Sequence, residues 1–418
     1  MIHIVFIILL FMIFLLRKSF SMYYFSPTGF LCAVWITFVF LVAVFAPDYF
    51  FTVQSSFYIF LFIFFFFLGE IFNNVIRKRK QKEWVPFEIT DHFKNNFESG
   101  LKIMGVVSIV GSVLYLIIFA NYFGGVMRLA NAGWAVRGAL IEGEIAVPFY
   151  VKLLLFPAYS NVILVLIYSI LFRRIKWFLI LPFIALFIMG FVQVGRAGFM
   201  LILFQVYIAI LFRILYKNSM DGGMTLKEHR LIMKSFILIF VVLLIFIGGD
   251  MLRKQDFTFD FSSINIFRQY LFGGISAFDT FLYKREFSET EYGLGKYTFS
   301  ALYDMLGISK NEFGVYLEYL KVSDKDKFTT NIFTAFRQFI DDFGIAGACF
   351  FMFLSGIVSN YYYNHAVKGH IKAISVSIVI YTIIFHSTML SITVHNSILL
   401  TLVLPNILLT LFSLKIKK

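Results

Sequence analysis

The sequence predicts an all-α membrane protein that crosses a lipid bilayer many times. Of its 418 residues, 60% are hydrophobic and 15% are charged, whereas an ordinary soluble domain has roughly 25% charged residues. Its mean hydropathy is +0.84. Apolar stretches recur along the chain, and each has about 15 to 23 residues, which is long enough or nearly long enough to cross a hydrocarbon core of about 30 Å. Soluble architectures are therefore excluded.

The first apolar segment, residues 2–16, is expected to be a retained helix. No positive charge precedes it, and Arg17 and Lys18 follow it. This charge order is the reverse of that in a secretory signal peptide. We expect this helix to start outside the cytoplasm and to end inside.

Later helices are expected wherever an apolar stretch lies between charged connections. The expected segments are 28–46, 55–75, 101–120, 150–172, 177–194, 198–216, 235–249, 342–361, 373–391 and 397–414. Together with the first segment, they make about eleven transmembrane helices.

The net charge of +13 is concentrated in short connections. Basic residues gather in RKRKQK (77–82), in RRIK (173–176), at 227–234, at 368–372 and in the tail KIKK. One orientation, with the N-terminus outside and the C-terminus inside, places every basic cluster on the cytoplasmic side, as the positive-inside rule requires. The basic balance therefore reports orientation in a membrane, and no nucleic acid is expected as a partner.

Two of the expected outer loops are unusually long. Residues 121–149 carry Arg128 and Arg137, and residues 250–341 carry near-balanced acids and bases with scattered aromatic residues. A loop of this length in a compact protein is usually functional or disordered, and the aromatic content argues against disorder. We expect the larger loop to form short helices that cap a single membrane domain of residues 1–418.

One arginine lies between two long apolar runs. In FVQVGRAGFMLI (191–202), Arg196 is expected at the outer interface, where the sixth helix meets the seventh. Gly195 and Gly198 let backbone or ligand approach closely. Arg196 is either an arginine that snorkels to lipid headgroups or part of an anion site, because the free N–H groups of a helix N-terminus beside a guanidinium suit phosphate.

A second candidate region runs from Thr329 to Gly356, from the end of the larger loop into the ninth expected helix. Arg337, Asp341 and Asp342 lie there within one short amphipathic segment. If this segment is helical, Arg337 and Asp341 share a face and can form an interfacial salt bridge. Alternatively, an acid beside an arginine is what a glycosyl-transfer site needs to deprotonate a sugar hydroxyl.

Four sequence elements carry a resemblance to a known family. They are TNIFTAFR (330–337), DDFGIAG (341–347), FRQYLFGGISAFDTFL (267–282) and GRAG (195–198). With these motifs, the number of helices and a large late outer loop, most of the chain resembles the Wzy-type O-antigen polymerases, which polymerise oligosaccharide repeat units. The most specific element is the TNxxTAxR and DFGxxG string. The resemblance implies a GT-C-like membrane fold.

The resemblance also implies a reaction and its partners. Such enzymes are glycosyltransferases of the bacterial inner (plasma) membrane whose active site faces the periplasm. Donor and acceptor are both undecaprenyl-diphosphate-linked oligosaccharides, and the product is O-antigen or a related surface polysaccharide. Membrane lipid, a chain-length regulator and a flippase are further implied partners. No cofactor is implied, and because DKD (324–326) is interpreted as a solvated charge run, we expect the transfer to be independent of metal.

Arginines suit the lipid diphosphate because they stay charged and fork onto phosphate oxygens. On this resemblance Arg196 is assigned to the diphosphate, with Arg337 and Arg268 completing the cradle. Arg128 and Arg137 are further candidates from their position in the smaller outer loop.

Three residues are candidates for the base that accepts the hydroxyl proton. Asp342 and Asp341 belong to the family-like string, whereas His395 lies in the short outer turn SITVHN (391–396). Histidine has an intrinsic pKa of about 6.5, which suits proton transfer.

Two other functions stay open at this point. An O-antigen ligase, which transfers finished glycan to lipid A core, has a similar number of helices, a large outer loop and an outer-face arginine. A polysaccharide flippase or secondary transporter usually carries charges within its helices. Glu70, in the third expected helix, is either such a transport residue or a partner of the basic cytoplasmic end.

Overall fold

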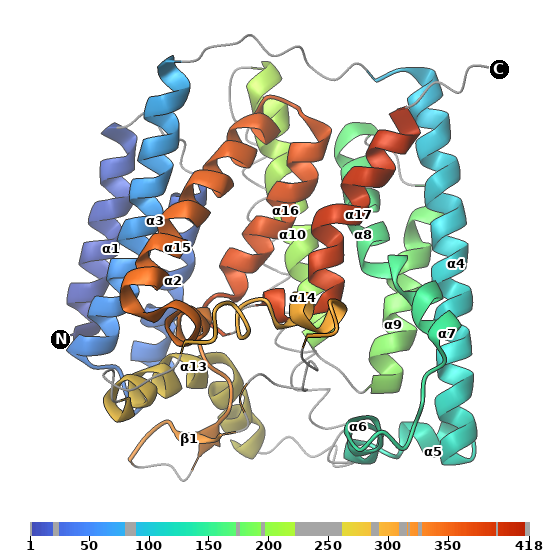
Figure 1. The fold of residues 1–418 in the computed structure, drawn as a ribbon, viewed down its shortest axis with the longest axis horizontal. Coiled ribbons are helices and arrows are strands. Elements are labelled where there is room, and N and C mark those ends of the chain that lie inside the picture. Colours follow the sequence, from blue (N-terminus) through green and yellow to red (C-terminus); the bar gives the residue numbers. More distant parts are fainter. Residues whose placement is uncertain are drawn as a thin grey trace. The chain divides into compact units, whose positions relative to one another are not determined.

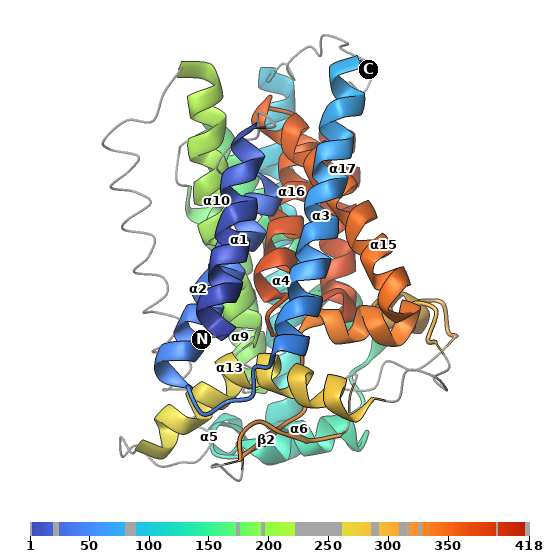
Figure 2. The ribbon, with the colours of Figure 1, turned by 90° about the vertical axis from the view of Figure 1, so that its left-hand side faces the viewer.

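The computed structural model is built almost entirely of helices (Figures 1 and 2). It describes residues 2–19, 25–79, 89–172, 176–193, 197–221, 261–285, 292–308, 316, 318–324, 328–389 and 392–413. The chain forms two compact units that interleave along the sequence. The first unit comprises Met1–Val85, Ile264–Asn364 and Ile380–Leu399, and the second comprises Pro86–Ser263, His365–Val379 and Leu400–Lys418.

The first unit combines long helices with a small extended segment. Its elements are α1 (Ile2–Ser19), α2 (Pro27–Phe45), α3 (Val53–Arg79), most of α13 (Phe261–Lys284), α14 (Ser300–Met305), β1 (Leu320–Lys321), β2 (Thr329–Thr330), most of α15 (Ala335–Val367), the end of α16 (Ile371–His386), η2 (Ile392–Val394) and the start of α17 (Asn396–Ser413). Helix α1 packs against α2 and α3, and α13 lies crosswise at one end of these helices (Figure 2). Strands β1 and β2 pair antiparallel, with Leu320 opposite Thr330.

The second unit is organised around one long helix, α4 (Asp91–Phe123). Its other elements are α5 (Val126–Ala130), α6 (Trp134–Ile141), α7 (Phe149–Leu155), α8 (Pro157–Phe172), η1 (Trp177–Ile180), α9 (Leu181–Gln193), α10 (Ala197–Asp221), the start of α16 and most of α17. Helix α4 packs against α7, α8 and α9. Buried apolar side chains such as Tyr115, Phe119, Val151 and Val192 form the core between them.

Local signals set the ends of α4. The hydroxyl of Thr90 accepts the backbone N–H of Phe93 at 3.2 Å and caps the first turn, which a threonine N-cap typically does. Gly124 follows the last turn with a φ of 77°, a left-handed conformation that ends helices and favours glycine. The helix therefore begins ten residues before the apolar segment 101–120, in a polar stretch that hydropathy alone does not include.

The apolar helices confirm an all-α protein with several helices suited to a membrane. Within the described ranges, six helices are long and apolar enough to cross a bilayer: Pro27–Phe45, Val53–Ile76, Asp91–Phe123, Phe149–Phe172, Ala335–Val367 and Asn396–Ser413. Shorter apolar helices are Ile2–Arg17, Trp177–Gln193, Leu201–Leu215 and Ile371–His386. Every predicted helix overlaps one of these except 235–249, which lies outside the described residues. The total of eleven spans stays a prediction.

The segment predicted as the larger outer loop contains more regular structure than expected. We predicted short helices there, but α13 alone has 24 residues. In addition, α15 begins at Ala335, seven residues before the predicted start at 342. The reason is that Arg337 and Asp341 interrupt the apolar pattern without interrupting the helix.

Helices α3 and α15 approach each other closely at two glycines. A methyl group at Gly69 would lie 2.0 Å from the carbonyl oxygen of Phe353, and one at Gly356 would lie 2.0 Å from that of Phe66. Small residues at such crossings let helix backbones pack directly. One α-helical turn or so further on, Asn360 donates from Nδ2 to Oδ1 of Asn74 at 2.8 Å. Glycine contacts and amide hydrogen bonds thus hold α15 against α3. Helix α15 carries the candidate site.

Candidate functional site

The site begins at a break inside α15. Gly344 has a φ of 66° and a ψ of −179°, which is not helical, and a positive φ favours glycine. The backbone carbonyls just before the break accept hydrogen bonds from another loop: Gly293 N donates to Asp341 O at 3.0 Å, and Leu294 N to Asp342 O at 3.1 Å. Because a break leaves helical carbonyls in need of donors, the loop 292–299 replaces the missing helical turn.

Asp342 holds the same loop through its side chain. Its Oδ1 accepts the backbone N–H of Tyr297 at 3.0 Å, and its Oδ2 accepts that of Thr298 at 2.5 Å. The residue is 0% exposed. Successive backbone N–H groups directed at one anion form a concave anion site, and here the protein's own carboxylate occupies it. Asp342 therefore anchors the loop 292–299 to α15.

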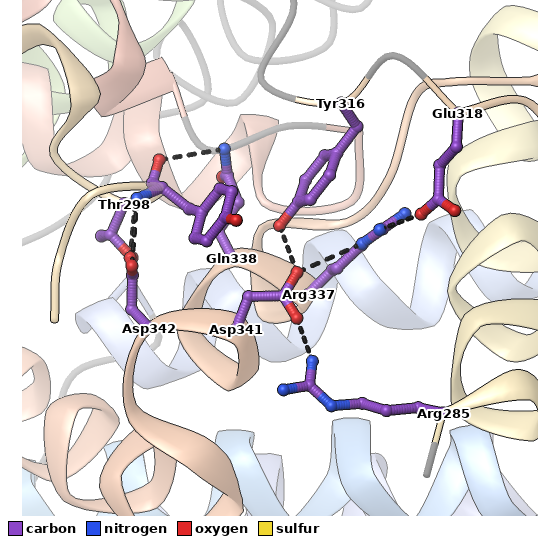
Figure 3. Close-up of polar contacts among 9 residues, drawn as sticks. Arg285, Thr298, Tyr316, Glu318, Arg337, Gln338, Asp341 and Asp342 are labelled. Carbon is purple, nitrogen blue, oxygen red and sulfur yellow. Dashed lines mark hydrogen bonds and ion pairs between the residues drawn. The ribbon is translucent and has the colours of Figure 1, made fainter. Parts of the chain in front are cut away.

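The neighbouring acid, Asp341, is the centre of a charged cluster (Figure 3). Its Oδ2 accepts from Nε of Arg337 at 3.4 Å and from the phenol of Tyr316 at 2.6 Å. Its Oδ1 pairs with Nη1 of Arg285 at the end of α13. The i,i+4 pairing of Arg337 with Asp341 on one helical face, which the sequence predicts, is thus confirmed as an ion pair.

Arg337 lies almost wholly inside the protein, with 5% of its surface exposed. Its guanidinium carbon lies 3.7 Å from the ring centre of Tyr316, 3.9 Å from that of Phe333 and 4.5 Å from that of Phe281. A cation over aromatic faces is attracted by their quadrupoles. Its Nη2 pairs with Oε1 of Glu318. Its Nη1 is buried and has no hydrogen-bond partner among the residues that the structure describes.

Tyr316 connects the cluster to the anchored loop. Burial and the nearby charge of Asp341 raise the pKa of the Tyr316 phenol well above its usual range, so this group stays protonated and remains a donor to Asp341. On its other side the ring stacks with Tyr297, with 5.7 Å between centroids and 7° between planes. Gln338 donates from Nε2 to the Tyr297 carbonyl at 3.4 Å. The cluster and the loop 292–299 therefore form one packed assembly.

The formal charges of the four charged side chains in the cluster balance. We name the group Arg285, Tyr316, Glu318, Arg337 and Asp341 the Arg337 cluster. Two guanidiniums face two carboxylates, and 51% of the Glu318 side chain is exposed whereas the Arg337 and Arg285 side chains are 7% and 6% exposed. The cluster thus has an inner, desolvated part and one acidic member at the surface. Among the described residues, no group of three or more His, Cys, Asp or Glu side chains is arranged to hold a metal ion.

Arg268, the third predicted diphosphate ligand, lies in the same unit but in a different set of contacts. Its Nη2 pairs with Oδ1 of Asp48 at 2.5 Å, and its guanidinium lies 5.2 Å from the Tyr49 ring centre. Oδ2 of Asp48 also accepts from the hydroxyl of Ser323 at 3.2 Å. These contacts join α13 to the α2–α3 connection and to the segment after β1.

The remaining predicted residues are not gathered around Arg337 in the described part of the chain. Arg196 lies outside the described residues, as does the side chain of Arg137, although the backbone of α6 is described. Arg128 is exposed on α5 in the second unit. His395 is exposed between η2 and α17, and the described contacts of the Arg337 cluster do not include it.

Three members of the Arg337 cluster were not identified from the sequence: Arg285, Tyr316 and Glu318. Arg285 follows the family-like stretch 267–282 within three residues, and this proximity is the one signal that pointed toward it. Tyr316 and Glu318 stand in an irregular segment with no motif. Only the folding of that segment against α15 brings them to Arg337.

The intramembrane carboxylate Glu70 is engaged with the start of α2. It is 0% exposed, and its Oε2 accepts the backbone N–H of Thr28 at 2.9 Å. Arg17 is 1% exposed and donates to the hydroxyl of Ser26 at 3.4 Å, which itself accepts the N–H of Gly29 at 3.3 Å. An anion is stabilised at a helix N-terminus. Glu70 and Ser26 therefore cap α2 together.

Comparison with protein-family models, with curated proteins and with solved structures returned no match for this chain.

Proposed function

We propose that this protein is a lipid-linked oligosaccharide polymerase of the Wzy type, a glycosyltransferase on the outer face of a bacterial inner membrane. The observation that carries the proposal is the Arg337 cluster. It combines two buried guanidiniums with two carboxylates at one end of α15, and the charge pattern of the sequence predicts this end to face outward. A charged, largely desolvated cluster at a membrane interface is expected to be functional rather than stabilising.

Glycosyl transfer from a lipid diphosphate needs cations that hold the leaving group. Nη1 of Arg337 has no hydrogen-bond partner among the described residues, so a phosphate oxygen that reached this nitrogen would receive a charge-assisted hydrogen bond. Arg285 is joined to Arg337 through Asp341, which holds both guanidiniums in place. We propose that these two arginines bind the diphosphate. The sequence-based assignment of Arg196 to the diphosphate stays a prediction, since Arg196 lies outside the described residues.

The proposed reaction balances without a cofactor. A hydroxyl oxygen at the non-reducing end of the acceptor forms a bond to the anomeric carbon of the donor. The bond between that carbon and the phosphate oxygen breaks, and the undecaprenyl diphosphate leaves with the electron pair. The hydroxyl proton passes to a carboxylate near the arginines, as general base catalysis requires.

The described contacts favour this function over transport. A transporter needs an intramembrane charge that is free to change its partner during the cycle. Glu70 instead uses Oε2 to cap α2, and the carbonyl oxygen of Glu70 accepts from Nδ2 of Asn360 at 3.0 Å. These contacts support a structural role for Glu70.

Reconstitution with a defined substrate tests the proposal. The purified full-length chain in liposomes is supplied with one undecaprenyl-diphosphate-linked repeat unit, and products are separated by size. A ladder of lengthening glycans supports a polymerase. Transfer of a preformed polymer to lipid A core, without a ladder from the single unit, supports the ligase instead. Movement of the lipid-linked unit between leaflets without any new glycosidic bond supports a flippase.

A further inference from the structure

We infer that Glu318 is the general base that takes the proton from the acceptor hydroxyl, an inference that rests on the proposed function. The candidate region holds three carboxylates that lie close to Arg337 in sequence or space, namely Asp341, Asp342 and Glu318. They differ in what their oxygen atoms already bind. A base must reach the hydroxyl within hydrogen-bonding distance, so a carboxylate whose oxygens are occupied inside the protein is unsuited.

Asp342 is excluded by its contacts. Each of its two oxygens accepts a backbone N–H, from Tyr297 and from Thr298, and none of its surface is exposed. A sugar hydroxyl cannot approach it unless the loop 292–299 detaches. Asp342 is therefore a positioning residue for that loop.

Asp341 is nearly as constrained. Its oxygens accept from Arg285, from Arg337 and from the Tyr316 phenol, and its side chain is 13% exposed. Three donors, two of them charged, thus already bind its two oxygen atoms. Asp341 therefore fixes the positions of Arg285 and Arg337, the two arginines proposed to bind the diphosphate.

Glu318 differs from both acids in exposure and in partners. Half of its side chain, 51%, is exposed, and Arg337 contacts it through Oε1. In the described structure Oε2 makes no hydrogen bond or ion pair. A carboxylate oxygen with an open lone pair at the protein surface is accessible to a hydroxyl from outside.

Glu318 also stands in the right place relative to the proposed leaving-group site. The same guanidinium donates from Nη2 to Glu318, whereas its Nη1 has no partner in the described part of the chain. If Nη1 binds a phosphate oxygen of the donor, the rigid, planar guanidinium holds the leaving group at Nη1 and the Glu318 carboxylate at Nη2. The two groups are then neighbours. In the proposed step, Oε2 of Glu318 takes the hydroxyl proton as the oxygen attacks the anomeric carbon, and the diphosphate departs toward Arg337.

The experiment compares Glu318→Gln, Glu318→Asp and Asp324→Asn with the unaltered chain. Full-length proteins are assayed at saturating lipid-linked donor and acceptor, and donor binding is measured separately with a fluorescent lipid-linked unit. Asp324 is the matched control because it is an acid of the same segment, its side chain is 82% exposed, and it pairs only with Lys321 in the described part of the chain.

We expect Glu318→Gln to slow transfer by about 100-fold or more, the usual contribution of a general base. Donor binding should stay within about threefold, because the amide oxygen still accepts from Arg337. Glu318→Asp should retain part of the rate.

Two results would overturn the inference while leaving the polymerase intact. In one, Glu318→Gln transfers sugar at a rate within about threefold of the unaltered protein. In the other, Glu318→Gln weakens donor binding but keeps the saturated rate, which identifies Glu318 as a residue that only positions Arg337. If the unaltered protein makes no glycan when donor and acceptor are both supplied, the proposed function itself is wrong.

Discussion

Thr298 donates its backbone N–H to Oδ2 of Asp342 at 2.5 Å, across 44 residues of sequence. Together with the hydrogen bond from Tyr297 N, this contact occupies both oxygen atoms of the Asp342 carboxylate. This residue of the DDFG string therefore holds the loop 292–299. The glycine of the same string breaks α15 and frees the carbonyls that the loop then caps. We therefore attribute the Asp-Phe-Gly part of this string to the attachment of the loop 292–299 to α15.

Replacement of this anchor should reduce stability. Asp342→Asn places an NH₂ donor against a backbone N–H that is already a donor, and leaving one buried N–H unsatisfied costs about 1–3 kcal/mol. Thermal unfolding of the purified protein in detergent should therefore occur at a lower temperature, whereas Asp324→Asn should not change it. Unchanged stability with complete loss of transfer would instead assign Asp342 a chemical role.

Arg337 should not tolerate lysine. Its guanidinium contacts Glu318 and Asp341 at the same time, and a single ammonium group cannot reproduce this planar fork. Cells that depend on Arg337→Lys should make glycan of one repeat unit and no long chains, as seen by gel electrophoresis. Lys321→Ala, which removes an exposed cation of the same unit, should leave chain length unchanged. Normal long-chain glycan from Arg337→Lys would contradict the diphosphate assignment.

Asp341 and Glu318 should differ in their effect on stability. Asp341→Ala leaves two largely buried guanidiniums without their shared anion, and breaking a buried pair in this way costs about 3–5 kcal/mol. Glu318→Ala removes a half-exposed partner, for which about 1 kcal/mol or less is expected. Denaturant or thermal unfolding of both variants measures the difference. An equal decrease in the free energy of unfolding for the two variants would mean that Glu318 is as desolvated in the membrane as Asp341.

The close crossing of α3 and α15 predicts a strong effect from single methyl groups. Gly69→Ala and Gly356→Ala each place a methyl group 2.0 Å from a carbonyl oxygen of the partner helix, so the helices must separate. Overpacking of this kind typically costs about 1–3 kcal/mol. Gly138→Ala is the control, because nothing lies within 4 Å of the added methyl group. The amount of folded protein in the membrane, measured by gel filtration in detergent, should fall for the first two variants only.

The orientation of the chain can be measured by labelling from each side. Tyr319 is 64% exposed beside Glu318, and Lys368 is exposed in the connection between α15 and α16. The native cysteines, Cys32 and Cys349, are buried. Tyr319→Cys should react with a membrane-impermeant maleimide in intact spheroplasts, whereas Lys368→Cys should react only after lysis. The reverse pattern would place the Arg337 cluster in the cytoplasm and exclude the proposed polymerase.

Much of the helical framework follows from local sequence. Hydropathy located every apolar helix of the described ranges, because burial in lipid requires an unbroken apolar stretch whose backbone groups pair with one another. The ion pair of Arg337 with Asp341 also follows from spacing, since residues four apart meet on a helix. Hydropathy places the starts of α4 and α15 too late, because it does not detect the polar part of a helix and both helices carry polar or charged residues in their first turns.

The tertiary structure decided which distant residues each charged side chain binds. In sequence Asp341 and Asp342 are equivalent neighbours. In the folded protein, one contacts Arg285 and Tyr316 and the other contacts the loop 292–299, because successive residues of a helix do not share a face. These partners are distant in sequence, and no local periodicity specifies such pairings. They exist because buried donors and acceptors must be satisfied wherever the folded chain brings them together.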